Sequence, residues 1–388
     1  MKKKIAILGS TGSIGKTLIN ILKKDKKNTN IILLAANKNI KELLKQALFF
    51  DVKNIIISDR IKFLQAKKIL KNKRTNIYND FKSFNKIFSQ NKIDYAMCAM
   101  SGLVGLEPCL NIIEFTKKIA IANKESIICG WPLIAQKIKK YNVAFIPIDS
   151  EHFSIYSLLN KFTNSDIEKI YITASGGPFH KLPLKDFNNI TRKDALKHPN
   201  WTMGKKISID SATMMNKVFE VIETKKIFNV NFNKIEILVH PKSYVHAMIK
   251  FKNGITKILI HDTSMMIPIF NSLYEDDKKS IKSKKLNFSL INDLNFSKIN
   301  IKKFPITKIL KFLPEKHSLF ETLLVSLNDK LVKMFLNDKI KFVDISKIFL
   351  KTVNNKKYEK YKHISPKNVN DIIKLDNYVS TNIQLKSI

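Results

Sequence analysis

Two carboxylates at the end of an apolar run could hold a metal ion. Asp149 and Glu151 directly follow the strand-like run at residues 143–148. Residues two apart on an extended chain share one face, so we expect both side chains to converge at the carboxyl end of the strand, where α/β proteins place ligands. Two carboxylates without a thiol suit Mg²⁺ or Mn²⁺. By itself, the pair could equally be a solvated loop pair.

A third carboxylate, Glu220, lies on a helix predicted over residues 211–228. The apolar residues of this segment recur at i, i+3, i+4 and i+7, namely Met215, Val218, Phe219 and Ile222. Asn216, Lys217 and Glu220 lie opposite this stripe and form one polar face. Taken alone, that face could be a surface with ordinary charge pairs.

Two further segments have a composition that suits an anion. Residues 174–178, Ala-Ser-Gly-Gly-Pro, offer backbone N–H groups and a hydroxyl in a glycine turn. Residues 198–204, His-Pro-Asn-Trp-Thr-Met-Gly, resemble a mobile lid. Its aromatic side chain could cover a reactive ring and exclude water.

A glycine loop near the amino terminus predicts a dinucleotide site. Gly9, Gly12 and Gly15 follow a strand-like run and precede a helical pattern. Glycine lets the backbone approach a pyrophosphate, and the amino end of the helix offers free N–H groups. The alternative is a tight turn without a ligand, but the strand before it and the helix after it favour the cofactor.

The second strand-like run favours NADP over NAD. NAD sites place an acidic residue about 20 residues after the glycine loop, where it binds the ribose 2′-hydroxyl. Here the run ends in Asn37, Lys38 and Asn39. An acidic side chain would repel a 2′-phosphate, whereas Lys38 and the two amides could hold one.

The elements that position these residues predict an α/β protein. Strand and helix signals alternate through residues 1–150, which indicates a doubly wound, Rossmann-like parallel sheet. We expect an NADPH-binding domain there, and an α+β catalytic domain at 151–274 with a lid at about 175–205. A lysine-rich linker at 275–300 and a small helical domain at 301–388 complete the prediction.

Composition limits the other function classes. The formal charge of +37 invites a nucleic-acid reading, but lysine is spread through every segment of the 388 residues, and no basic stripe with interleaved aromatics occurs. Three scattered cysteines, Cys98, Cys109 and Cys129, indicate a reducing compartment and core packing rather than disulfides or a metal site. We read the amino terminus as a first strand and expect a cytoplasmic protein without a membrane segment.

Six motifs together resemble 1-deoxy-D-xylulose-5-phosphate reductoisomerase. They are GSTGSIG at 9–15, ANKES at 122–126, DSEH at 149–152, SGGPF at 175–179, HPNWTMGKKISIDSATMMNK at 198–217 and HPKS at 240–243. They occur in family order, and the 198–217 block is very specific. In the last third, the resemblance rests on size and helicity, with Asn328-Asp329 as a weak match to an Asn-Glu pair.

This resemblance implies a two-step reaction. 1-Deoxy-D-xylulose 5-phosphate would be isomerised to a branched aldehyde phosphate and then reduced by NADPH to 2-C-methyl-D-erythritol 4-phosphate, the committed step of non-mevalonate isoprenoid synthesis. It also implies a homodimer. Asp149, Glu151 and Glu220 would hold Mg²⁺ or Mn²⁺, and Lys124 would lie beside substrate and nicotinamide.

The resemblance also implies the remaining contacts. The residues expected to contact substrate are Lys124, Ser150, Glu151, Ser175, His198, Trp201, Ser211, Asn216, Lys217 and Glu220, with the phosphate received by Ser175, Ser211, Asn216 and Lys217. The residues expected near the cofactor are Thr11, Gly12, Ser13, Ile14, Asn37, Lys38, Asn39, Asn123, Glu125 and Gly204. Trp201 and Met203 would lie on the lid.

The chain departs from the family pattern at three places. Asn37 stands where the family usually has glycine, Lys242 where glutamine is expected, and the 261–269 stretch replaces a more acidic, arginine-containing pattern.

Two alternative functions remain open from the sequence. Another NADP dehydrogenase, such as a homoserine or semialdehyde enzyme, leaves DSEH and the 198–217 block unexplained. A basic nucleic-acid-binding protein explains the charge and none of the motifs.

Overall fold

The computed structural model describes residues 2–70, 75–89, 92–159, 162–201, 203–275 and 277–382. Their contacts divide the chain into two compact units. The first contains residues up to Ile127, Trp131–Phe153 and Met265–Lys282. The second contains Ile128–Gly130, Ser154–Ser264 and the residues from Ser283 onward. Each unit has its own sheet.

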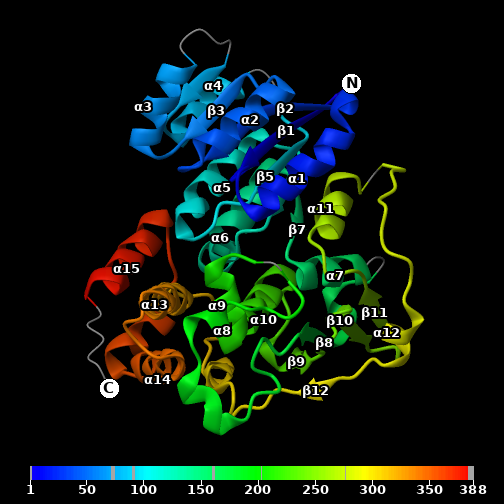
Figure 1. Ribbon diagram of the computed structural model, residues 1–388, viewed down its shortest axis with the longest axis vertical. Coiled ribbons are helices and arrows are strands. Elements are labelled where there is room, and N and C mark those ends of the chain that lie inside the picture. Colours follow the sequence, from blue (N-terminus) through cyan, green and yellow to red (C-terminus); the bar gives the residue numbers. More distant parts are fainter. Residues whose placement is uncertain are drawn as a thin grey trace. The chain divides into compact units, whose positions relative to one another are not determined.

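The first unit is built on a seven-stranded parallel sheet (Figure 1). Its strands are β1 (Lys3–Leu8), β2 (Thr29–Ala36), β3 (Asn54–Ile57), β4 (Asn76–Tyr78), β5 (Tyr95–Cys98), β6 (Lys118–Ile121) and β7 (Ala144–Pro147). The spatial order is β4-β3-β2-β1-β5-β6-β7. The chain therefore starts in the middle and winds outward in both directions, which confirms the predicted doubly wound fold.

Helices connect these parallel strands. They are α1 (Ser13–Lys24), α2 (Ile40–Phe50), α3 (Arg60–Ile69), α4 (Phe84–Ile87), α5 (Leu106–Ile112), α6 (Lys124–Tyr141) and the start of α7 (Ser150–Leu158), with short 3₁₀ turns at Lys26–Asn28, Phe81–Ser83, Leu103–Gly105 and Ile113–Phe115. Ile5 to Leu8 are all buried, as expected for a parallel strand covered on both faces.

A later segment of the chain completes the core of the first unit. Helix α11 (Met266–Leu273) contributes Ile269 and Leu273 to the cluster around β1 and α1. A buried hydrogen bond of 2.8 Å joins the Tyr95 hydroxyl to Ser272 Oγ, and Lys3 Nζ donates to the Leu273 carbonyl. Nothing in the sequence pattern indicated this return.

The second unit contains a five-stranded mixed sheet in the order β11-β10-β8-β9-β12. Its strands are β8 (Ile167–Ala174), β9 (Ile235–Val239), β10 (Val245–Phe251), β11 (Thr256–Ile260) and β12 (Ser297–Lys298). Only β8 and β9 pair in parallel among these described strands. The mixed sheet agrees with the α+β class predicted for this part of the chain, but β11 and β12 are short and largely exposed and lack clear alternation.

The helices of the second unit include the long segments predicted near the carboxyl end. They are α8 (Arg192–Ala195), α9 (Lys205–Thr213), α10 (Met215–Phe228), α12 (Phe288–Asn292), α13 (Leu319–Leu336), α14 (Phe342–Val353) and α15 (Val369–Asn382), with 3₁₀ turns at Asn164–Asp166, Leu184–Asn189, Phe232–Lys234, Pro305–Lys311 and Lys356–Lys362. Val221 and Phe228 of α10 pack with Ile170 and Ile237 of the sheet. No helix in the described part of the chain is long and apolar enough to cross a membrane.

The single helix predicted over 211–228 is wrong. Two helices, α9 and α10, meet at Met214, which has a φ of 68° in the left-handed region that non-glycine residues rarely adopt. Thr213 Oγ1 accepts from the Met215 N–H at 3.3 Å, which satisfies a backbone donor at the break. The apolar stripe at Met215, Val218, Phe219 and Ile222 lies wholly after the corner, so periodicity alone could not reveal it.

Candidate active site

The glycine loop after β1 is closed so tightly that two of its glycines have no room for a side chain. Gly9 has a φ of 90°, and a Cβ there would lie 2.5 Å from the Ala99 carbonyl oxygen. A Cβ on Gly15 would lie 2.3 Å from the Gly9 carbonyl oxygen. Helix α1 begins at Ser13, so its first N–H groups lack intrahelical acceptors. The loop residues predicted to contact the cofactor, Thr11, Gly12, Ser13 and Ile14, are exposed or half-buried. This geometry suits a pyrophosphate.

The residues after β2 are exposed, and two of the three have structural tasks. Asn37 Nδ2 donates to Ser58 Oγ at 2.8 Å, which links the ends of β2 and β3. Asn39 caps helix α2 by accepting from the Glu42 N–H at 3.2 Å. Lys38 lies between them as the charged member of the group.

Asn123 is buried at the amino end of α6 and uses its side chain inside the protein. It accepts from the Ser126 N–H at 2.7 Å as the helix cap, and it donates to the carbonyls of Met100 and Gly102. These bonds tie the loop after β5 to the loop after β6. Lys124 and Glu125 follow in the first turn of α6, with the Glu125 side chain buried.

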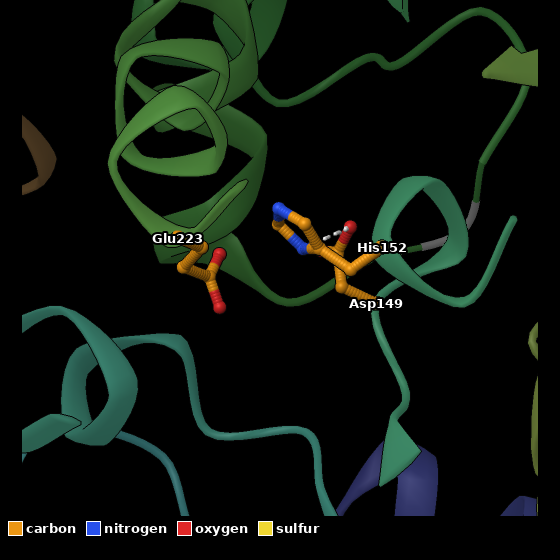
Figure 2. Close-up of side chains that lie close together, drawn as sticks. All are labelled: Asp149, His152 and Glu223. Carbon is orange, nitrogen blue, oxygen red and sulfur yellow. Dashed lines mark ion pairs between the residues drawn. The ribbon is translucent and has the colours of Figure 1, made fainter. Parts of the chain in front are cut away.

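Asp149 is the centre of a polar group at the carboxyl end of β7. Its Oδ2 lies 3.1 Å from Lys124 Nζ. Its Oδ1 lies 3.3 Å from His152 Nδ1, the pair joined by a dashed line in Figure 2. Oδ1 also accepts from the Glu151 N–H at 3.3 Å. His152 is fully buried, with its Nδ1 facing Asp149 Oδ1.

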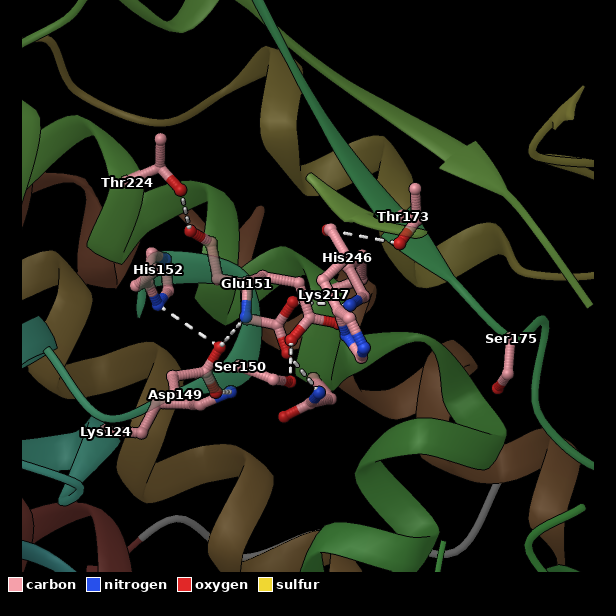
Figure 3. Close-up of polar contacts among 12 residues, drawn as sticks. Lys124, Asp149, Ser150, Glu151, His152, Thr173, Ser175, Lys217, Thr224 and His246 are labelled. Atoms are coloured by element: carbon pink, nitrogen blue, oxygen red, sulfur yellow. Dashed lines mark hydrogen bonds and ion pairs between the residues drawn. The ribbon is translucent and has the colours of Figure 1, made fainter. Parts of the chain in front are cut away.

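Strand alternation is the wrong explanation for the approach of Asp149 and Glu151. Strand β7 ends at Pro147, and helix α7 begins at Ser150. Asp149 therefore precedes the helix, and Glu151 lies in its first turn, where the helix dipole favours negative charge. The Ser150 hydroxyl donates to Glu151 Oε2 (Figure 3).

A glycine turn follows β8 in the second unit and carries Ser175. Gly177 has a φ of 67°, and a Cβ there would lie 2.9 Å from the Ser211 carbonyl oxygen. The absence of a side chain therefore lets the turn approach the end of α9. Ser175 Oγ accepts from the Gly177 N–H at 3.1 Å and lies 3.1 Å from His198 Nε2.

His198 connects this turn to the predicted lid. Its Nδ1 accepts from the backbone N–H groups of Asn200 and Trp201, at 3.1 and 3.0 Å. An acceptor nitrogen carries no hydrogen, so Nε2 carries it and donates to Ser175. Burial and the charge of Lys217 lower the pKa of His198 to about 4, which keeps the ring neutral at neutral pH.

The lid is fixed at a second point. Asn200 Nδ2 donates to the Pro241 carbonyl and to Ser243 Oγ, both at 2.8 Å. Trp201 and Met203 are half-buried, Gly204 is the exposed cap residue of α9, and Thr202 lies outside the described residues. His198 and Asn200, at the start of this short segment, are therefore both attached to neighbouring loops.

The corner at Met214 brings the end of α9 close to the first turn of α10. Asn216 Nδ2 and Lys217 Nζ both contact the carboxylate of Glu220. Lys217 and Glu220 are 5% and 1% exposed, so the alternative of a solvated surface face is wrong. One buried helix therefore carries both a cation and a carboxylate.

Sequence reasoning missed the support for α9. Asn328 of α13 donates to Asp210 Oδ1 at 2.7 Å, while Lys206 pairs with Asp210 at 3.3 Å and with Asp329 at 3.0 Å. Asn328 and Asp329 are more than 100 residues from their partners Asp210 and Lys206, so no local pattern could connect them. Asn328-Asp329 gave the one weak signal.

The fold and these side chains define a dinucleotide-binding oxidoreductase with carboxylates at the end of β7 in its first unit and a second unit suited to an anionic substrate. Comparisons with known proteins agree. Family models for 1-deoxy-D-xylulose 5-phosphate reductoisomerase match residues 5–130, and two models for its C-terminal domains match residues 145–228 and 261–381. The chain belongs to the 1-deoxy-D-xylulose 5-phosphate reductoisomerase family.

Similar proteins cover nearly the whole chain. The reductoisomerase of Pelagibacter ubique is 58% identical over 387 residues, with all of both chains covered. That of Clostridium tetani is 37% identical and covers 89% of this chain and 91% of its own. A reductoisomerase crystal structure in complex with NADPH, fosmidomycin and magnesium matches with a TM-score of 0.89 and 29% identity, over 97% of this chain and 96% of that one. The Zymomonas mobilis enzyme in complex with NADPH gives a TM-score of 0.87 at 29% identity, over 98% and 97%.

Proposed function

We propose that this chain isomerises 1-deoxy-D-xylulose 5-phosphate and reduces the product to 2-C-methyl-D-erythritol 4-phosphate with NADPH and a divalent metal ion. Family membership over the whole chain supports this reaction. The observation in the structure that carries it is helix α10. This helix combines the buried ammonium group of Lys217, suited to a phosphate, with the buried carboxylate of Glu220, suited to a metal.

The metal ligands that we propose are Asp149, Glu151 and Glu220. Asp149 and Glu151 lie in the first unit and Glu220 lies in the second, and the family resemblance implies that all three hold one ion. Three carboxylates fit a hard ion such as Mg²⁺ or Mn²⁺. A bound ion would polarise the substrate carbonyl and orient the neighbouring hydroxyl.

The ammonium group of Lys124 is placed to stabilise negative charge. Its ion pair with Asp149 fixes the long side chain, which is 12% exposed, next to the acidic group. We propose that it stabilises the developing oxyanion of the substrate. Ser150 and Asn216 would bind substrate hydroxyls.

The phosphate would be received by Ser175, Ser211, Asn216 and Lys217. The two bonds that Ser175 Oγ accepts leave its own hydrogen to donate to a phosphate oxygen. Phosphate binding does no chemistry itself, but its binding energy can hold the lid and orient the reacting carbons. His198 and Trp201 would take part through the lid.

NADPH would bind across the glycine loop. The pyrophosphate would lie at the start of α1, and Lys38 would contact the 2′-phosphate. Asn37, Asn39 and Asn123 would shape the site mainly by holding their loops, given the internal bonds that their amides make. Glu125 and Gly204 complete the proposed cofactor residues.

The test is NADPH oxidation with deoxyxylulose phosphate, followed at the NADPH absorbance. We expect turnover that stops with EDTA and returns with Mg²⁺ or Mn²⁺. Glu220→Gln should remove the activity, whereas Glu359→Gln, at an exposed carboxylate, should leave it unchanged. Full turnover in the Glu220→Gln variant would refute the metal assignment, and equal turnover with NADH would refute the role of Lys38.

We also propose that the chain acts as a homodimer in the cytoplasm, as the family resemblance implies. The chain mass is 44.8 kDa. Light scattering should therefore give about twice this mass. A single species at the mass of one chain would contradict the dimer.

A further inference from the structure

Two histidines stack face to face beside the lid. The rings of His246 and His261 have centroids 3.7 Å apart and an interplanar angle of 15°. Their side chains are 2% and 9% exposed. His246 lies in β10, and His261 directly follows β11, at the start of the 261–269 stretch that departs from the family pattern.

Backbone carbonyls determine which nitrogen of each ring carries a hydrogen. His246 Nε2 lies 3.1 Å from the His261 carbonyl oxygen, and His261 Nδ1 lies 2.7 Å from the Asp262 carbonyl oxygen. A carbonyl only accepts, so both nitrogens are donors. His261 Nε2 is then a buried acceptor, and it has no hydrogen-bond partner among the described residues.

A β-bulge directs His246 toward its partner. The pairing of β10 with β11 shifts between Val245 and Ala247, so His246 is the extra residue. Bulges of this kind re-aim a side chain. Thr173 of β8 holds the bulge, because its hydroxyl lies 2.5 Å from the Val245 carbonyl. The same hydroxyl lies 3.1 Å from the His246 carbonyl (Figure 3).

The stack meets the lid at Trp201. The Trp201 and His246 rings have centroids 6.1 Å apart at an interplanar angle of 72°, an edge-to-face contact. The backbone N–H of Trp201 is also one of the two that donate to His198 Nδ1. The lid therefore rests on His246, and His246 rests on His261.

We propose that His261 is a positioning residue that holds the ring plane of His246 so that the lid residue Trp201 can dock. This inference rests on the proposed function only where it concerns substrate binding. The flat face of the His261 ring is the feature that matters. Its nitrogens and its charge are not required.

Two apolar variants separate the flat face from the rest of the side chain. His261→Phe keeps a planar ring, His261→Leu fills similar space without one, and both remove the nitrogens. We expect His261→Leu to raise the KM for deoxyxylulose phosphate about three- to tenfold, the range of one aromatic contact. His261→Phe should stay within about twofold of the wild type. His363→Leu, at an exposed histidine, is the matched control.

Fluorescence gives a readout that needs no turnover. The chain has two tryptophans, and Trp131 packs against Phe145 in the first unit, so Trp131→Phe leaves Trp201 as the reporter. In this background, His261→Leu should shift the emission to longer wavelength and increase quenching by acrylamide. His261→Phe should not.

The inference is overturned if the leucine variant matches the wild type in both assays, or if leucine and phenylalanine are equally impaired. It also fails if the KM for NADPH rises as much as that for deoxyxylulose phosphate, since that would indicate a general structural effect. If His261→Leu does not fold, His261→Asn replaces it under the same expectations. Absence of wild-type turnover would refute the proposed function and leave the fluorescence comparison decisive for His261.

Discussion

His198 makes bonds in two directions, and two substitutions can separate them. In His198→Asn, the amide oxygen takes the place of Nδ1 and can still accept from the N–H groups of Asn200 and Trp201. In His198→Gln, the amide nitrogen takes the place of Nε2 and can still donate to Ser175. The asparagine variant therefore keeps the lid bonds, and the glutamine variant keeps the bond to the phosphate turn.

The number of bonds lost sets the expected magnitude. A neutral hydrogen bond contributes about 0.5–1.5 kcal/mol. His198→Gln loses two bonds, about 1–3 kcal/mol, which corresponds to roughly a 5- to 150-fold rise in the KM for deoxyxylulose phosphate. His198→Asn loses one bond and should raise this KM roughly 2- to 12-fold.

Steady-state kinetics at neutral pH show which of the two variants has the higher KM for deoxyxylulose phosphate. The glutamine variant should be the worse binder of deoxyxylulose phosphate, with the KM for NADPH unchanged in both. The reverse order would refute the lid role and show that the bond to Ser175 dominates.

The same histidine predicts a pH dependence of stability. Its pKa is about 4 in the folded chain, against the ordinary value of 6.5 when unfolded. Between these values, the unfolded chain binds a proton that the folded chain does not, so the free energy of unfolding falls as the pH drops from 6.5 toward 4. Denaturant melts of wild type and His198→Asn should diverge across this window. If the free energy of unfolding changes with pH equally in both proteins, that result would contradict a neutral, buried ring.

Three further predictions concern other parts of the chain. Gly15→Ala would place a Cβ 2.3 Å from a backbone oxygen of the loop, so the KM for NADPH should rise by about tenfold or more, and an unchanged value would argue against a tight cradle. Lys38→Glu should weaken NADPH much more than NADH in the same assay, and equal weakening would exclude a 2′-phosphate contact. Glu321→Gln should lower the free energy of unfolding by about 3–5 kcal/mol, because it leaves Lys226 buried without its 2.8 Å partner. Burial tends to raise the pKa of Glu321, but the hydrogen bond from His317 and the charge of Lys226 outweigh it and hold the pKa at about 2, below the ordinary 4.5. The stability from this pair is therefore present above pH 4.5 and lost as the pH falls toward 2, and equal acid sensitivity in Glu321→Gln would contradict it.

The sequence by itself determined the first domain fold and the family. Glycine spacing, strand runs and amphipathic helices are local signals, and they are sufficient because βαβ units are built from neighbours in sequence. The parallel sheet and the family are confirmed. The buried cysteines also agree with the expectation of core packing.

Only the tertiary structure decided how the site residues are held. The corner at Met214 depends on one left-handed backbone conformation, which leaves the hydrophobic period unchanged. The return of α11 to the first core, the bond from Asn328 to Asp210 and the stack of His246 on His261 join residues that are distant in sequence. Periodicity records which face of an element is buried but not which partner covers it, so these contacts had to come from the folded chain.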